Sequence, residues 1–295
     1  MKKESVLCVI TGIMVLLTGC NRVLDMPVGI QETIQMSPAE SYAEYSYEMT
    51  NNDYNTSAED ALKIDLNNLS ESMENTYIYE NRQLTIHAAG NYILTGNLSR
   101  GNLIIHVYDD EIVHLILDNV EISSYNGSAI YVENAGKVIL TLKEGTENIL
   151  SNSSGSDENQ KACIFSNSDL TINGTGKLCV YGYHADGIRS KDCLKLTDTN
   201  LFIRAEKDGL RGNDAVIILD SITEIESEGT GILSNSDNDM VVLQGGSCKV
   251  VAGENAISSN NLISIHDCMI NLYSILEKVK CNGILDINED NVNEI

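Results

Sequence analysis

A unit of 22 residues recurs through this chain and limits what it can fold into. Asp186-Gly187-Ile188, Asp208-Gly209-Leu210 and Thr230-Gly231-Ile232 each begin 22 residues after the one before. The unit also occurs 24 residues earlier, at Ala162-Cys163-Ile164, and 25 residues later, at Asn255-Ala256-Ile257. A nearly constant period of this size is typical of one supersecondary unit stacked many times.

The residues between these repeats alternate apolar and polar, as in Leu194-Lys195-Leu196 and Leu201-Phe202-Ile203. This alternation indicates β-strands. Short strands, turn residues and a constant period together predict an all-β fold, a parallel β-helix with about 22 residues per coil. Small residues are expected to stack at an inner corner, at Ser166, Ser190, Gly212, Ser234 and Ser259. Core positions are expected at Leu170, Leu194, Val216, Val241 and Leu262.

One stretch interrupts the period. Ile130 and Ile164 occupy equivalent positions but lie 34 residues apart, about ten more than one coil needs. We therefore expect residues 144–161 to form a loop that projects from the solenoid, where such insertions often shape a binding surface.

The N-terminus resembles a bacterial lipoprotein signal. A basic start is followed by an apolar run too short to span a membrane, and then by Leu17-Thr18-Gly19-Cys20. Residues 1–19 are predicted to be a signal peptide and Cys20 to be the lipidated N-terminus. The alternative is an ordinary signal peptide with a chance cysteine. Residues 20–58 are acidic and aperiodic, which favours a flexible tether, and residues 59–295 are predicted to form the β-helix.

The net charge excludes some partners. The whole chain carries −24, and removal of Lys2, Lys3 and Glu4 with the signal, a net +1, leaves −25. Such a surface disfavours nucleic acid and anionic lipid headgroups and favours divalent cations. We expect a monomer on the bacterial cell surface, anchored by lipid to the outer face of the cytoplasmic membrane.

Six cysteines follow Cys20, and an even number outside the membrane allows disulfides. The patterning favours a different interpretation, in which they act as small apolar residues. Cys179 and Cys248 fall where other coils place Phe or Ile, and Cys163 replaces Gly187.

Carboxylates occupy matching positions on adjacent coils. Asp186 and Asp208 form one predicted pair, and Asp192 and Asp214 form another. Stacked coils lie about 4.8 Å apart, so each pair repels unless it is solvated or binds a cation. A calcium ion with oxygen ligands at about 2.4 Å suits such a pair. The alternative is ordinary turn chemistry, because Asp-Gly is a common turn pair.

Basic residues gather in the same region. The candidates for binding a substrate are Arg189, Lys191, Lys207 and Arg211. They either balance the charge of the aspartates or grip the carboxylates of a ligand through guanidinium forks.

Several motifs in this region are similar to those of one bacterial family. They are Ala162 to Gly174, Asp186 to Asp192, Asp208 to Asp214, Gly90 to Gly101 and Glu144 to Asn148. The chain resembles the "carbohydrate-binding domain-containing" β-helix family of secreted and lipid-anchored proteins over about residues 60–270. The resemblance implies a right-handed parallel β-helix with calcium sites like those of pectate lyases. It also implies binding of plant polysaccharides, including acidic ones, without catalysis.

Three functions are therefore open. The first is a lipoprotein that binds polysaccharide on a calcium-bearing face. The second is a calcium-dependent polysaccharide lyase, which needs a metal to acidify the sugar and a basic Lys or Arg to remove a proton. The third is a surface scaffold.

Overall fold

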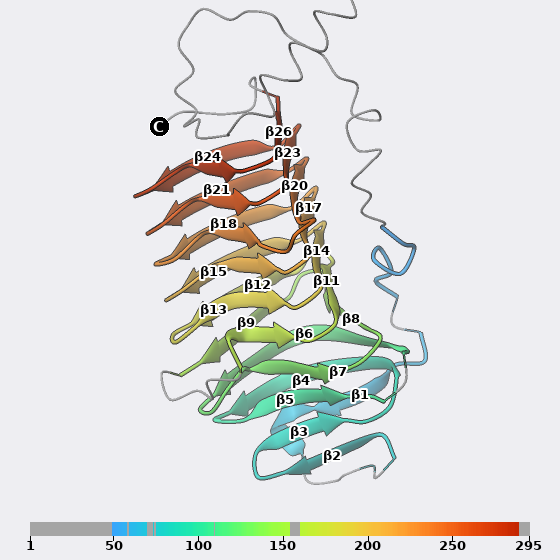
Figure 1. Cartoon of the computed structure of the whole chain (residues 1–295). Helices are drawn as coiled ribbons and strands as arrows, with labels where there is room; N and C mark the ends of the chain where they lie inside the picture. Colours follow the sequence, from blue (N-terminus) through green and yellow to red (C-terminus); the bar gives the residue numbers. More distant parts are fainter. Residues whose placement is uncertain are drawn as a thin grey trace, which may run out of the picture.

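A computed structural model describes residues 49–57, 59–69, 73, 75–108, 110–153 and 160–288. The expected signal peptide, Cys20 and most of the expected tether lie outside these residues. Within them, strands stack in parallel into a solenoid (Figure 1), so the all-β parallel β-helix predicted from the 22-residue period is confirmed. No helix among the described residues is long and apolar enough to cross a membrane.

Each regular coil contributes one strand to each of three faces, which we call faces A, B and C. Face A contains β8 (Lys137–Leu142), β11 (Asp169–Asn173), β14 (Cys193–Thr197), β17 (Ala215–Leu219), β20 (Met240–Gln244), β23 (Leu262–His266) and β26 (Ile284–Ile287). Face B contains β9 (Glu147–Asn152), β12 (Lys177–Gly182), β15 (Asn200–Ala205), β18 (Ile222–Ser227), β21 (Ser247–Ala252) and β24 (Met269–Ser274).

Face C is a separate ten-stranded sheet. It contains β2 (Tyr77–Glu80), β3 (Gln83–Ile86), β5 (Asn102–His106), β7 (Ile130–Asn134), β10 (Ala162–Ser166), β13 (Asp186–Ser190), β16 (Leu210–Gly212), β19 (Ile232–Ser234), β22 (Ile257–Ser259) and β25 (Val279–Cys281). Strands β2 and β3 form an antiparallel hairpin, and the rest of the face is parallel. The long strands β4 (Gly90–Ser99) and β6 (Ile112–Ser124) continue through faces A and B. Strand β1 (Leu62–Asp65), followed by the short 3-10 helix η1 (Leu66–Asn68), pairs with β4.

The corner between faces A and B is built on residues with a left-handed backbone. They are Asn119, Gly174, Asp198, Asp220, Gly245 and Asp267. Glycine, asparagine and aspartate are the residues that tolerate this conformation best. The sequence therefore turns the chain at the same point in successive coils, which keeps the coils in register.

The interior is an apolar core, and most of the predicted positions lie in it. Leu170, Leu194, Val216 and Val241 are paired in register and are all fully buried. The next member of this row is Ile263 rather than Leu262. Leu262 instead packs with Met240 and Ala215 in a second apolar cluster. The prediction was wrong by one residue, and a shift of one residue reverses the side of a strand that a side chain faces.

The expected small residues are also in place. Ser166, Ser190, Gly212 and Ser234 pair in successive coils, and Ser259 is buried in the coil that follows. The six cysteines are thiols, of which five are buried. Cys163 pairs between its neighbours at the position of Gly187, and Cys179 lies opposite Phe202, as the patterning indicated.

The loop predicted at residues 144–161 contains a strand of the solenoid, so the prediction was wrong for that part. Strand β9 occupies Glu147–Asn152 and pairs with β6 on one side and β12 on the other. The extra length therefore lies between β9 and β10, where residues 154–159 are outside the described part.

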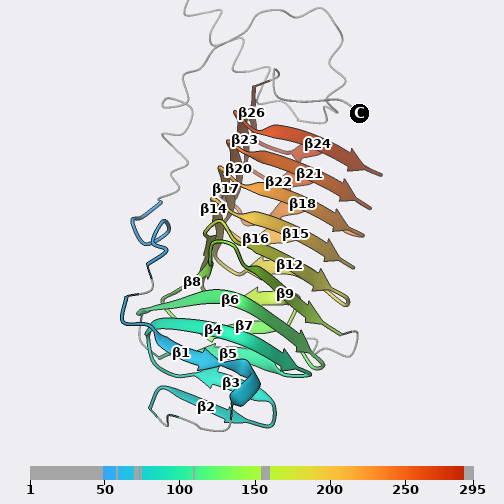
Figure 2. The same ribbon diagram turned by 180° about the vertical axis from the view of Figure 1, so that it is seen from behind.

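The described end of the expected tether contacts the solenoid. Residues 49–57 run along the outside of face A (Figure 2), and Asp53 is fully buried there. Its carboxylate pairs with Lys137 and Lys195 and accepts a hydrogen bond from Thr171. This part of the segment is thus held by a buried ion pair, which differs from the flexible tether expected up to residue 58.

Candidate functional site

The predicted aspartates Asp186 and Asp208 lie at one edge of the solenoid, where face B turns into face C. Asp186 begins β13, and Asp208 lies two residues before β16. The glycine after each aspartate is required by close packing. A Cβ on Gly187 would lie 2.7 Å from the Gly209 carbonyl oxygen and 2.4 Å from an Ile203 methyl, and Gly209 is equally confined. The Asp-Gly pair therefore combines a side chain on the edge with a backbone that permits the coils to approach.

The two carboxylates make the same pair of interactions. The Asp186 Oδ1 accepts a hydrogen bond from the Asp208 backbone N–H at 3.2 Å, and the Asp208 Oδ1 accepts one from Thr230 N–H at 2.9 Å. Each Oδ2 pairs with the arginine three residues later, at 3.4 Å for Arg189 and 3.1 Å for Arg211. Each aspartate thus links its coil to the next and fixes one guanidinium.

Asp186 is the most perturbed group of this edge. Burial and, after it, the Asp208 carboxylate raise the pKa of its carboxyl to about 6, although Arg189 and Arg211 act in the opposite direction. Burial and the neighbouring Arg211 lower the pKa of Arg189. A carboxyl that is costly to ionise and an arginine beside it are a common combination at functional sites.

These residues line an elongated groove of about 810 Å³. Five of the predicted site residues lie in it, namely Asp186, Arg189, Lys207, Asp208 and Arg211. Arg189 and Arg211 face the same way in adjacent strands, because they are paired in register between β13 and β16. The equivalence of positions in the sequence therefore placed these side chains correctly.

The other three predicted residues do not line this groove. The Lys191 ammonium lies 5.6 Å from the centre of the Phe165 ring. Asp192 and Asp214 belong to the corner between faces C and A, because β13 ends at Ser190 and the chain has already turned. The structure thus divides the predicted site into two parts. Asp186, Asp208 and the basic residues other than Lys191 line the groove, whereas Asp192 and Asp214 lie at the corner between faces C and A.

Some groove residues were not predicted. They are Gln160, Lys161, His184, Ala185, Glu206, Glu228, Gly229 and Glu254. Glu206 and Glu228 are separated by one 22-residue period, which was a signal in the sequence that could have identified them. The lining contains four lysines and arginines and five carboxylates. Because the chain as a whole has 19 basic and 43 acidic residues, the groove is enriched in cations.

Calcium can be assessed from the donors present. At Asp186 and Asp208 the carboxylate oxygens already accept hydrogen bonds and two arginines neutralise them, so a cation is disfavoured. Asp192 is different: burial raises the pKa of its carboxyl, and Asp169 and Asp214 raise it further. A cation would relieve this repulsion. In the described part of the chain, however, no three His, Cys, Asp or Glu side chains come together as a metal site.

The comparisons with known proteins agree with this architecture. A family model described as "carbohydrate-binding domain-containing protein" matches residues 80–289. A protein of that description from Acetivibrio thermocellus is 31% identical over 218 residues, which are 70% of this chain and 76% of that protein. A solved structure described as "polysaccharide lyase-like protein from C. thermocellum, Gadolinium derivative" is 26% identical, with a TM-score of 0.74 over 79% of this chain and 98% of that chain. This chain belongs to the carbohydrate-binding domain-containing protein family.

Proposed function

We propose that this protein is a non-catalytic, surface-attached protein that binds acidic polysaccharide along the groove at β13 and β16. The observation that carries the proposal is the register of Arg189 and Arg211. Adjacent coils present the two guanidinium groups in the same direction, about 4.8 Å apart along the stack. A polymer with regularly spaced carboxylates can engage such a row, because each guanidinium has five N–H donors and the aspartate uses only some of them.

Attraction must be local in this protein. At a net charge of −24 the chain repels a polyanion at long range, so binding needs a region where cations are concentrated and held in place. Lys161 and Lys207 add two further cations to the groove. The side chains of Arg189 and Arg211 are 19% and 21% exposed, so they are partly desolvated but still accessible to a ligand.

Binding to polygalacturonate tests the proposal. The variant with Arg189→Ala and Arg211→Ala is expected to bind polygalacturonate at least severalfold more weakly than the wild type, while methyl-esterified polygalacturonate, which lacks the charge, changes less. Arg204→Ala is the matched control, since Arg204 is an exposed arginine of β15 that pairs with Glu226 outside the groove. Unchanged affinity in the double variant would show that this groove is not the binding site.

A lyase is the second candidate, and the lyase-like description of the related structure is the observation that favours it. A lyase needs a basic residue that can accept a proton from the sugar. Arg189 and Arg211 are both held in ion pairs, which favours binding over catalysis. Incubation with polygalacturonate decides between the two, since a lyase produces unsaturated sugars that absorb ultraviolet light and a binding protein produces none.

Calcium and the lipid anchor complete the proposal. Asp192 and Asp214 are the pair that would hold calcium, with water or glycan oxygens as the remaining ligands. Cys20 would carry the lipid. The Cys20→Ala variant should be released from the membrane fraction or keep its signal peptide, and a variant that is processed and fractionates like the wild type would contradict the anchor.

A further inference from the structure

A second cavity lies on the same edge of the solenoid, nearer the N-terminal end. It has a volume of about 500 Å³ and is lined by Asn81, Arg82, Gln83, Arg100, Gly101, Asn102, Ser124, Tyr125, Asn126 and Gln160. None of these ten residues is acidic, although 43 residues of the chain are. Two arginines, one tyrosine, five side-chain amides and one hydroxyl are therefore available to an anionic, hydroxyl-rich ligand.

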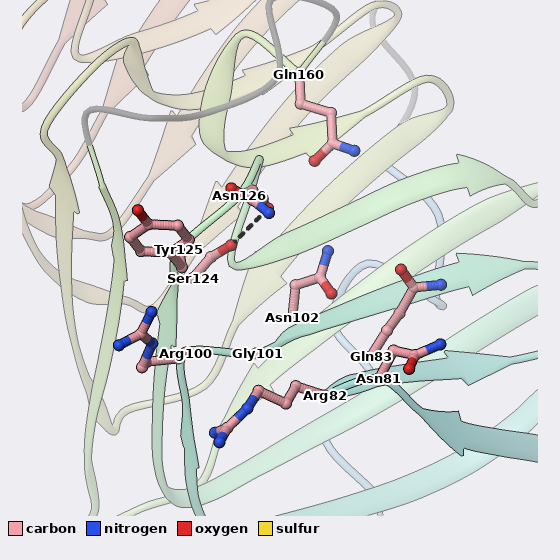
Figure 3. Close-up of a pocket in the computed structure, with 10 residues that line it drawn as sticks. All are labelled: Asn81, Arg82, Gln83, Arg100, Gly101, Asn102, Ser124, Tyr125, Asn126 and Gln160. Atoms are coloured by element: carbon pink, nitrogen blue, oxygen red, sulfur yellow. Dashed lines mark hydrogen bonds between the residues drawn. The ribbon is translucent and has the colours of Figure 1, made fainter.

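The two arginines are held in place. The Arg82 Nη1 donates a hydrogen bond to the Ser99 carbonyl at 3.2 Å. The Arg100 guanidinium lies over the ring of Tyr125, 4.8 Å from its centre. Figure 3 shows both guanidinium groups on the side of the cavity where Tyr125 lies, while the amides of Gln83 and Asn102 lie opposite. Neither arginine is neutralised by a carboxylate of the cavity lining.

The backbone at these arginines is unusual. Arg82 and Arg100 have φ angles of 66° and 56°, in the left-handed region that favours glycine and asparagine. Asn81 and Arg82 form the two-residue turn between β2 and β3, where Asn-Gly is the preferred pair. Both positions would be more favourable for the fold with glycine. Strained residues of this kind concentrate at functional sites, which points to a role for the guanidinium groups themselves.

The cavity adjoins the groove at β13 and β16. Both lie where face B turns into face C, and Gln160 lines both. Going up the stack, Arg100 precedes β5, Tyr125 precedes β7 and Gln160 precedes β10, and Asp208 lies at the same edge before β16. Four coil steps separate β5 from β16, or about 19 Å at 4.8 Å per step.

We propose that this cavity is a second site for a carboxylated sugar unit, bound by Arg82 and Arg100 with Tyr125 as an apolar surface, so that one polyuronate chain spans the cavity and the groove. The proposal rests on the proposed function and extends it to a defined second site. A long polymer that occupies both sites is held more tightly than a short oligomer at either one, because the second contact forms within the complex.

The test is the number of trigalacturonate molecules bound per chain, measured by calorimetry. The wild type should bind two. The variant with Arg82→Gly and Arg100→Gly should bind one, and its affinity for polygalacturonate should fall about tenfold or more, the effect of losing about one charged hydrogen-bonded contact. Because glycine suits both backbone positions, the melting temperature of this variant should not fall. The variant with Arg82→Asn and Arg100→Asn repeats the measurement with a side chain at both positions, since asparagine also tolerates this backbone conformation.

The outcomes separate this proposal from the one above. Two molecules bound by the glycine and asparagine variants would overturn the second site and leave the groove intact. One molecule bound by the wild type, lost in the glycine variant and retained in the Arg189→Ala and Arg211→Ala variant, would support the cavity and refute the groove. No binding by the wild type would refute both.

Discussion

The buried carboxyl of Asp186 provides a sensitive test of the electrostatics at the groove. Its side chain is only 3% exposed, and burial together with the Asp208 carboxylate raises its pKa to about 6 from the ordinary 3.8. The folded state therefore binds this proton more tightly than the unfolded state does. Stability from the protonated group is fully present below about pH 3.8 and is lost as the pH rises through about 6.

The size of the effect follows from the pKa difference. At 1.36 kcal/mol per pH unit, the difference between about 6 and 3.8 amounts to about 3 kcal/mol in full, and about 2.5 kcal/mol of it is lost between pH 4 and pH 7, because the unfolded carboxyl is already partly ionised at pH 4. The variant Asp186→Asn keeps the shape of the side chain and an oxygen that can accept the Asp208 N–H, but it has no proton to lose. The stability of the variant relative to the wild type should therefore increase by about 2.5 kcal/mol across this range.

Urea unfolding followed by circular dichroism, at half-unit steps from pH 4 to pH 7.5, measures this difference directly. Comparing the two proteins at each pH cancels the titration of the acidic residues that they share. The absolute offset between them depends on how well the asparagine accommodates Arg189, whereas the slope depends on ionisation alone. A difference that stays constant with pH to within about 0.5 kcal/mol would refute a perturbed Asp186.

Two further predictions concern other carboxylates. Burial opposes ionisation of Asp53, but hydrogen bonds from Lys137, Thr171 and Thr50 hold its pKa at about 2, so its stabilisation is present above about pH 4 and is lost as the pH falls to about 2. Asp53→Asn should destabilise the fold by about 3–5 kcal/mol at pH 7, as measured by urea unfolding, because it leaves buried lysines without their counter-charge; an effect below about 1 kcal/mol would contradict this role. Millimolar calcium should raise the melting temperature relative to chelator, and the increase should disappear with Asp192→Asn and Asp214→Asn; an equal melting temperature with and without calcium would refute the metal hypothesis.

The regular coils could be predicted from the sequence because each coil repeats the same pattern of strand and turn residues. The 22-residue period, the alternating strands and the Asp-Gly pairs recur together, so each coil confirms the position of the next. The same equivalence placed Arg189 and Arg211 side by side, which the register of β13 and β16 confirms. The period of the sequence is sufficient to predict the position of a residue that contacts only its own coil and the two adjacent coils.

Strand β9 was missed because polar residues occupy two of its three buried positions, with Leu150 between them. Asn148 and Asn152 are 0% and 2% exposed, where an apolar residue would have marked a strand. The Asn148 side chain accepts a hydrogen bond from Val120 N–H and donates to the Lys177 carbonyl and the Thr146 hydroxyl. An asparagine whose polar atoms are all hydrogen-bonded is stable in the interior. A prediction based on hydrophobic periodicity, however, places such a polar residue in a loop.

The contact of residues 49–57 with face A could not be predicted for a different reason. Asp53 pairs with Lys137, which lies 84 residues further along the chain, and no periodic feature connects the two. The segment before Asp53 is rich in acidic and polar residues, which is the composition of a tether. One buried carboxylate with its lysine and threonine partners can fix such a segment without changing its composition.

The cavity at Arg82 and Arg100 and the groove at Arg189 and Arg211 orient their guanidinium groups in different ways. In the groove a carboxylate holds each arginine, and the same carboxylate cancels much of its charge. In the cavity a backbone carbonyl and an aromatic ring hold the arginines, so their positive charge is retained for the ligand. The cavity should therefore contribute more attraction per arginine, and the groove more positional order. If one polyuronate chain binds both sites as proposed, it would be captured first at the cavity, where the arginines are not neutralised, and then aligned along the repeating coils.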